Sequence, residues 1–176
     1  MKKNKINIAI VGLGNIGTRV SELANALDFR ILGYRQDMSK SVPGVTLVSF
    51  EQLLAESDFV TLHLPLTDSN HHMLDSSAFQ QMKSSAYLIN TSRGPLVDHS
   101  ALAIALEQGE IAGAALDVQE PEPPDLSQPP FNDPRVIITP HAAFVSVESL
   151  IALRLSSVQN TLDVLLLGES KNTVNF

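Results

Sequence analysis

The sequence lacks cysteine throughout its 176 residues. Disulfides, thiol nucleophiles and thiolate metal sites are therefore excluded. No spacing of histidine, aspartate and glutamate predicts a metal site of another kind. The neighbours His71 and His72 are expected to be solvated loop residues.

Positive charge is also scarce, with 12 basic residues against 19 acidic ones and a net charge of −7. Because phosphate contacts need clustered Lys and Arg, neither nucleic acid nor an anionic membrane is an expected partner. The first apolar run is interrupted by Asn7 and ends at Gly12, which does not fit a signal peptide, and no window approaches the length of a membrane span. We expect a cytoplasmic protein with no membrane partner.

What is present is an alternation of short apolar runs with helical patterns. Hydrophobic residues make up 44% of a chain long enough for one domain of ordinary size. The pattern predicts helices at residues 16–27, 49–56 (in capping-box form), 75–83, 98–109 and 145–167, and strands at residues 6–11, 29–34, 45–48, 59–64, 87–90, 112–118 and 136–138. Alternating strands and helices with short loops predict an α/β fold of Rossmann type, a doubly wound parallel sheet with helices on both faces.

The loop at residues 119–134 holds most of the ten prolines. Proline cannot join a central strand, so this loop is expected to cover the surface near a site.

The segment Gly12-Leu13-Gly14-Asn15-Ile16-Gly17 fits G-x-G-x-x-G between a strand and a helix. The glycines allow a tight turn, close approach of the backbone to a pyrophosphate, and close helix–strand packing. The helix N-terminus offers unpaired N–H groups to the phosphates. We therefore predict that residues 1–176 form a dinucleotide-binding domain, with this loop at the phosphates.

An acidic residue normally ends the second strand of such a fold and binds the ribose 2′-OH. Here Arg35 stands eighteen residues after Gly17. A guanidinium pairs with a 2′-phosphate, which favours NADP over NAD as the NAD(P) cofactor. The alternative is a solvated Arg35, with Asp37 making the ribose contact.

From Leu53 onward, several segments resemble the D-isomer-specific 2-hydroxyacid dehydrogenase family in order and spacing. They include SDFVTLHLPLT at 57–67, LINTSRG at 88–94, GAALDV at 113–118 and TPH at 139–141. The resemblance implies the cofactor domain of a two-domain dehydrogenase, with the substrate domain missing. The chain is then a fragment, a natural short form, or one half of a two-chain enzyme.

The resemblance also implies a catalytic set for 2-keto acid reduction or the reverse reaction. Arg93 is expected to bind the substrate carboxylate, and His141 to be the acid–base group. Glu122 is expected to pair with His141, fix its ring and raise its pKa. Glu120 lies two residues earlier, so spacing alone does not choose between the two glutamates, whereas the family pattern selects Glu122. A structural role for Arg93, tying down its own loop, is the alternative.

Further residues are implied at the cofactor. Asp117 resembles the residue that holds the nicotinamide carboxamide, with a strand-end cap as the alternative. The family positions at the cofactor also include Leu64, Pro65, Thr91 and Ser92.

Two residues depart from the family pattern. Gln119 replaces the usual Phe, and Phe144 replaces a small residue three positions after His141. A large ring there would narrow or block the cleft, which puts turnover in question more than cofactor binding.

Residues 146–168 resemble the helix that returns to the substrate domain in the family. Its apolar positions recur at helical spacing. Without a substrate domain, we expect two copies to cover this helix in a homodimer, or the helix to fold back on its own sheet. The function is then either an NAD(P)-dependent 2-hydroxyacid oxidoreductase or a non-catalytic cofactor-binding module.

Overall fold

The structure is a computed structural model that describes residues 5–170 and 172. It divides into two compact units, Met1–His141 and Ala142–Phe176. Strands and short helices alternate through the first unit, and one long helix makes up most of the second.

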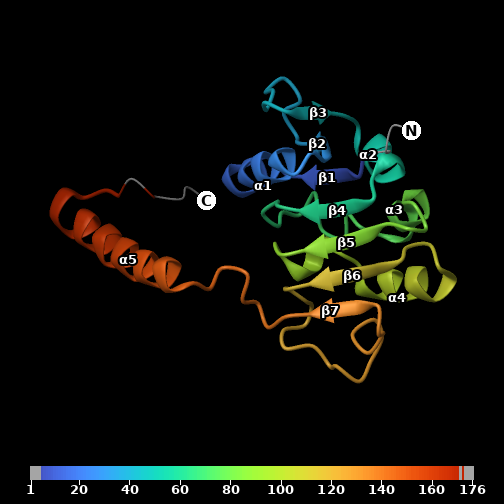
Figure 1. Cartoon of the computed structure of the whole chain (residues 1–176). Helices are drawn as coiled ribbons and strands as arrows, with labels where there is room; N and C mark the ends of the chain where they lie inside the picture. Colours follow the sequence, from blue (N-terminus) through green and yellow to red (C-terminus); the bar gives the residue numbers. More distant parts are fainter. Residues whose placement is uncertain (1–4, 171, 173–176) are drawn as a thin grey trace. The chain divides into compact units, whose positions relative to one another are not determined.

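One parallel sheet of seven strands, in the order β3-β2-β1-β4-β5-β6-β7, forms the centre of the first unit (Figure 1). Six of these strands have the order 3-2-1-4-5-6 of a dinucleotide-binding sheet, so the predicted Rossmann-type fold is confirmed. Because every ladder is parallel, all the strands end at one edge of the sheet. The strands are β1 (Asn7–Val11), β2 (Arg30–Tyr34), β3 (Val45–Leu47), β4 (Phe59–Leu62), β5 (Tyr87–Asn90), β6 (Gly113–Leu116) and β7 (Val136–Ile138).

Every predicted strand is present, but two of them end two residues earlier than predicted. β4 stops at Leu62, opposite Asn90 at the end of β5, so the apolar residues beyond it belong to a loop. β6 likewise stops at Leu116 rather than at Val118. Apolar character continues past these strand ends because the following residues are still covered by neighbouring loops.

The helices are α1 (Asn15–Ala26), α2 (Phe50–Glu56), α3 (Ser76–Gln81), α4 (His99–Gln108) and α5 (Val147–Leu167), with a 3-10 turn, η1, at Gly94–Leu96. Asp75 and Asp98 cap α3 and α4 as predicted, because each carboxylate accepts backbone N–H bonds from the first turn.

The predicted capping box at α2 is only half formed. Ser49 accepts from the backbone N–H of Gln52, but the side chain of Gln52 donates to Glu56 rather than back to Ser49. A complete capping box occurs instead between Ser146 and Ser149 at α5. The sequence did not suggest it, because the usual partner at that position is Glu or Gln.

Helices cover both faces of the sheet, as predicted. Phe79 of α3 and Leu102 of α4 are fully buried in the larger core, together with residues of α2 and of the strands. Ala24 of α1 packs in a smaller core with Ile10 and Ile31 on the opposite face. On that second face the outer strands leave apolar side chains exposed, with Ile137 of β7 67% exposed.

The second unit leaves α5 exposed. None of its described residues is buried within that unit, and Leu155, Leu165 and Leu166 are each at least 66% exposed. With 21 residues and a mean hydropathy of 1.3, the helix is long and apolar enough to cross a membrane by length and composition alone.

The expectation that no window approaches a membrane span is therefore wrong. The helix carries three charged residues, Glu148, Arg154 and Asp163, and its mean hydropathy is still 1.3. Length and composition do not distinguish a spanning helix from one that packs on another protein surface.

Candidate active site at the carboxyl edge of the sheet

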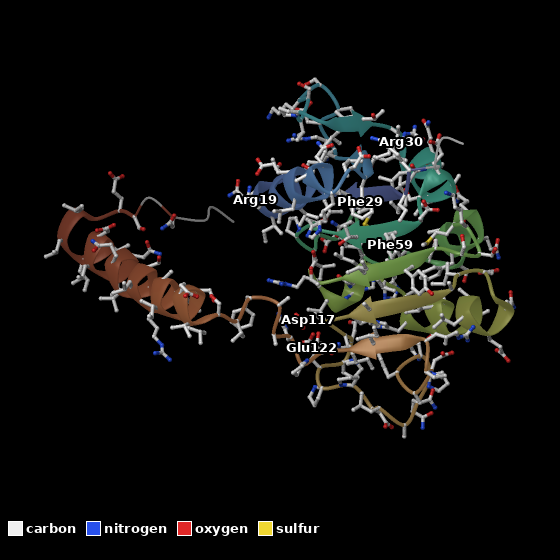
Figure 2. All side chains as sticks on the ribbon, in the orientation of Figure 1. Arg19, Phe29, Arg30, Phe59, Asp117 and Glu122 are labelled. Carbon is white, nitrogen blue, oxygen red and sulfur yellow. The ribbon has the colours of Figure 1, made fainter. Side chains whose placement is uncertain are left out.

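The carboxyl edge of the sheet collects the predicted site residues of the first unit. Asp117 and Glu122 lie at this edge, whereas Arg30 lies at the opposite edge, where β2 begins (Figure 2). In a parallel sheet the side chains that follow the strands converge at such an edge, which is where ligands of doubly wound folds bind.

The glycine loop links β1 to α1 with the spacing that a dinucleotide needs. Gly12 has a φ of +98°, and a Cβ there would lie 2.5 Å from the carbonyl oxygen of His63. A Cβ on Gly17 would lie 1.9 Å from the carbonyl oxygen of Gly12. A Cβ on Gly14, in contrast, would meet nothing within 4 Å. The first and third glycines are thus required for packing, and the second leaves open space beside the backbone.

The N-terminus of α1 points its first amides toward this open space. Gly14 is the N-cap and makes no side-chain cap bond, and the first turn contains no acidic residue. Asn15 and Ile16 are exposed in that turn. Unpaired amides at the positive end of a helix bind phosphate, so the loop fits the pyrophosphate of a dinucleotide.

Arg35 follows the last residue of β2, as the sequence predicted. Its Nη1 lies 3.4 Å from the carbonyl oxygen of Lys40. Asp37 is engaged locally, because its carboxylate accepts the backbone N–H and the hydroxyl of Ser39. These Ser39 bonds hold the pKa of Asp37 below its ordinary value. Arg35 thus has a long contact with Lys40, and its charge also contributes to lowering the pKa of Asp37.

The ends of β4 and β5 are tied together at the predicted cofactor residues. The Ser92 hydroxyl donates to the carbonyl oxygen of Leu62 at 2.6 Å, and its backbone N–H donates to the buried Asn90. Thr91 is exposed in the same turn, and Pro65 is exposed beyond the end of β4. Leu64 is half-buried.

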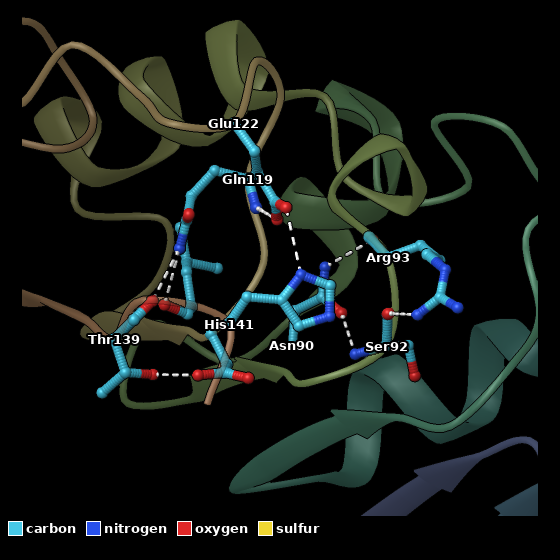
Figure 3. Close-up of polar contacts among 9 residues, drawn as sticks. Asn90, Ser92, Arg93, Gln119, Glu122, Thr139 and His141 are labelled. Atoms are coloured by element: carbon cyan, nitrogen blue, oxygen red, sulfur yellow. Dashed lines mark hydrogen bonds and ion pairs between the residues drawn. The ribbon is translucent and has the colours of Figure 1, made fainter. Parts of the chain in front are cut away.

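Arg93 is the next residue in the turn after β5. Its guanidinium is exposed and donates to the carbonyl oxygen of Ser92 at 2.6 Å, while its own carbonyl oxygen accepts from the Asn90 side chain at 2.8 Å. Its charge reaches Glu122, whose pKa it helps to lower. Arg93 thus ties its own loop, with its guanidinium directed toward Ser92 (Figure 3).

Glu122 and His141 form an ion pair, with 3.0 Å between Oε2 and Nδ1 (Figure 3). The other carboxylate oxygen of Glu122 accepts the backbone N–H of Gln119 at 2.9 Å. This backbone bond, followed by the bond and charge of His141, holds the pKa of Glu122 below 4.5. The carboxylate is therefore ionised at neutral pH and is held from two sides.

His141 lies in the left-handed region with a φ of +51°. Its backbone N–H donates to the carbonyl oxygen of Asp117 at 2.9 Å. The main chain after β7 thus turns the imidazole toward Glu122 rather than continuing the strand.

The two glutamates that the sequence left ambiguous have different partners. Glu120 lies beside His72, with 3.7 Å between its carboxylate and Nε2, whereas Glu122 pairs with His141. The family pattern and the geometry therefore both select Glu122 as the partner of His141. His63, in turn, contacts Thr61, and burial lowers its pKa.

Asp117 is buried at the end of β6 and accepts the hydroxyl of Thr139 at 2.5 Å. Its backbone N–H donates to the carbonyl oxygen of Asn90, so it also joins β5 to β6. These contacts are those of a strand-end cap, and they also set the carboxylate at the edge where a cofactor would lie.

Gln119 was recognised only as a departure from the family pattern, but the structure gives it a clear position. It is buried, and its side-chain amide donates to the carbonyl oxygens of Leu116 at 2.9 Å and Thr139 at 3.4 Å. Its backbone N–H holds Glu122. Its departure from the family pattern was the only signal in the sequence.

A cavity of about 560 Å³ opens beside the ion pair. It is lined by Gln119, Glu122, Pro123, Pro124, Leu126, Ile138, Thr139, Pro140 and His141. The proline-rich loop thus covers the surface next to the site, as its composition predicted. Phe144 belongs to the second unit and is 55% exposed there, so its predicted effect on the cleft stays a prediction.

The family model "D-isomer specific 2-hydroxyacid dehydrogenase, NAD binding domain" matches residues 2–143. The chain belongs to this family. A glyoxylate reductase of Korarchaeum cryptofilum is 47% identical over 148 residues, which are 81% of this chain and 44% of that protein. The D-isomer specific 2-hydroxyacid dehydrogenase of Lactobacillus delbrueckii ssp. bulgaricus, in its NAD-complexed form, is 34% identical with a TM-score of 0.87, and the match covers 97% of this chain and 56% of that one.

A second solved structure extends the range of relatives. An acyclic imino acid reductase in complex with NADPH and D-Arg is 30% identical with a TM-score of 0.89, and the match covers 97% of this chain and 54% of that one. This dehydrogenase-family chain thus spans about half the length of the relatives it matches.

Substitution of the glycines should separate cofactor binding from folding. Gly14→Val adds a side chain in open space where the pyrophosphate would lie, so we expect cofactor binding to be lost with a normal melting temperature. Gly17→Val should instead unfold the loop, because the new Cβ meets backbone at 1.9 Å. Nicotinamide fluorescence transfer and thermal denaturation measure the two effects, and undiminished binding by Gly14→Val would contradict the assignment.

The pKa of Glu122 tests the structure of the ion pair. We expect its carboxyl ¹³C resonance to titrate below 4.5, and His141→Ala to raise the midpoint only part of the way, because the Gln119 amide remains. Since the folded pKa is lowered, the stabilisation is present above the unfolded pKa and is lost as the pH falls through the folded value. A full return to 4.5 in His141→Ala would show that the backbone bond contributes nothing.

Proposed function

We propose that this chain is the cofactor-binding half of an NAD(P)-dependent oxidoreductase that interconverts a 2-keto acid and a 2-hydroxy acid. The observation that carries the proposal is the Glu122–His141 ion pair, at 3.0 Å, on the same sheet edge as Arg93 and the glycine loop. The printed activities of the relatives, glyoxylate reductase among them, support the same reaction class.

Reduction of a keto acid needs a proton donor at the carbonyl oxygen and a cation at the carboxylate. The bound nicotinamide supplies the hydride. His141 is assigned the proton, with Nδ1 held by Glu122, so that the other ring nitrogen exchanges the proton with the substrate. Because the pKa of Glu122 is lowered, its carboxylate is ionised at neutral pH and can accept the bond from the imidazole.

Arg93 is assigned to the substrate carboxylate. Its guanidinium stays charged and is exposed, and its present bond to the Ser92 carbonyl is one that a carboxylate can replace. Asp117 is assigned to the nicotinamide carboxamide, and Leu64, Pro65, Thr91 and Ser92 to the remaining contacts with the cofactor.

The second candidate function is a cofactor-binding module without turnover. It is favoured by the span of the chain, which is about half that of the relatives. Titration of the purified chain with NADH and NADPH, followed by assays against a panel of 2-keto acids, separates the two functions. Binding without turnover on any substrate supports the module.

Replacement of the histidine tests the enzyme function. Where turnover is found, His141→Ala should lower kcat by roughly 10²–10⁴-fold, because the proton donor is lost. Cofactor affinity should stay at the wild-type value, since His141 lies outside the glycine loop. A variant with the wild-type rate would remove His141 from the mechanism.

We also propose a preference for NADPH, carried by Arg35 at the end of β2. The proposal is supported by the acyclic imino acid reductase, a relative of similar structure that was solved in complex with NADPH. Arg35→Asp should cost about 1.5–3 kcal/mol of NADPH affinity, since one charge-assisted contact is lost. NADH lacks the 2′-phosphate and is the internal control in isothermal titration. A wild-type protein that binds NADH more tightly would contradict the preference.

The exposed apolar surface of α5 leads us to propose a homodimer in solution. A surface of this kind usually marks an interface, and a two-fold contact is the commonest closed arrangement. Light scattering at micromolar concentration should give twice 19.0 kDa, and Ile151→Ser with Leu155→Ser should shift the mass toward the monomer. A clean monomer mass for the wild type would mean that the helix is covered within its own chain.

A further inference from the structure

A second group of metal-ligating side chains lies outside the proposed catalytic set. It consists of His71, His72 and Glu120. One ligand atom from each residue lies within 4.8 Å of the other two. The sequence did not predict this group, because Glu120 is 48 residues from His72 and comes from a different loop.

The two histidines lie side by side although they are neighbours in the chain. Their ring centroids are 3.9 Å apart with a tilt of 32°. In an extended chain consecutive side chains point to opposite sides. Here His72 has a φ of +52°, in the left-handed region, and both imidazoles share one side of the loop.

The backbone of this loop is held in place by the neighbouring turn. The N–H of His72 donates to the carbonyl oxygen of Pro95 at 2.8 Å, and the N–H of Leu74 donates to that of Leu96 at 3.1 Å. The side chain of Glu120 approaches from the proline-rich loop, 3.7 Å from Nε2 of His72. The two histidines and Glu120 therefore come together from two different loops.

Two imidazoles and one carboxylate are a ligand set used for zinc, with a fourth position left for water. Ligand atoms at zinc distances are about 3.3 Å apart in a tetrahedral shell. The His72 Nε2 and the Glu120 carboxylate are 3.7 Å apart, and all three ligand atoms lie within 4.8 Å of one another. The carboxylate of Glu120 supplies the negative charge that a dication requires.

We infer that His71, His72 and Glu120 bind a divalent transition-metal ion of the zinc class. The ion joins the loop that carries the two histidines to the loop that carries Glu120. The site uses none of Arg93, Glu122 and His141, and it does not depend on the proposed reaction.

Zinc titration of the untagged, cofactor-free chain tests the site. Isothermal titration should give one Zn²⁺ per chain, and the imidazole resonances of His71 and His72 should shift together in NMR spectra. His71→Ala, His72→Ala and Glu120→Gln should each weaken binding by at least about tenfold, since even outer-shell partners of metal ligands contribute 10–100-fold.

Glu122→Gln is the matched control, because it alters the second glutamate of the same loop, and it should leave the zinc affinity unchanged. Circular dichroism checks that each variant is folded. The inference is overturned by the absence of zinc binding at millimolar concentration, or by equal affinity in the wild type and Glu120→Gln. Loss of binding in Glu122→Gln or His141→Ala, with His71→Ala unaffected, would place the ion at the Glu122–His141 pair and overturn it as well.

Discussion

The close contact between Gly94 and Gln119 sets the geometry of the whole site. A Cβ on Gly94 would lie 2.1 Å from the carbonyl oxygen of Gln119, so the turn after β5 and the loop after β6 meet backbone to backbone. Arg93 stands directly before this contact, and Gln119 holds Glu122 directly after it. A residue larger than glycine at position 94 would push the cation and the acidic group apart.

The electrostatics of the site follow from that contact. The Glu122 carboxylate is held by a main-chain amide, which is rigid, and by an imidazole, which can change its charge. Because the first partner does not titrate, the carboxylate stays in position in either protonation state of His141. The side-chain amide of Gln119 adds a further tie between the ends of β6 and β7. The proposed acid–base pair thus rests on backbone geometry more than on side-chain packing.

The parallel sheet explains why residues so far apart in the chain form one site. All seven strands end at the same edge of the sheet. The glycine loop follows β1, the turn with Arg93 follows β5, Asp117 follows β6, and His141 follows β7. The same arrangement brings the proline-rich loop against two other segments. These are the turn at residues 94–96 and the loop that carries His72. Glu120 reaches His72 for this reason, whereas Glu122 turns toward the end of β7.

The sequence by itself determined the alternation of strands and helices, the glycine loop between β1 and α1 and the helix caps at Asp75 and Asp98, because these depend on local periodicity and on side chains that bond within one turn. The ends of β4 and β6 could not be predicted, since they depend on where the neighbouring strand stops. Spacing left Glu120 and Glu122 open, and only contacts with His72 and His141 separated them. The position of Gln119 and the grouping of His71 and His72 with Glu120 were likewise decided by the tertiary structure, because each requires two loops, distant in the chain, to meet at one edge of the sheet.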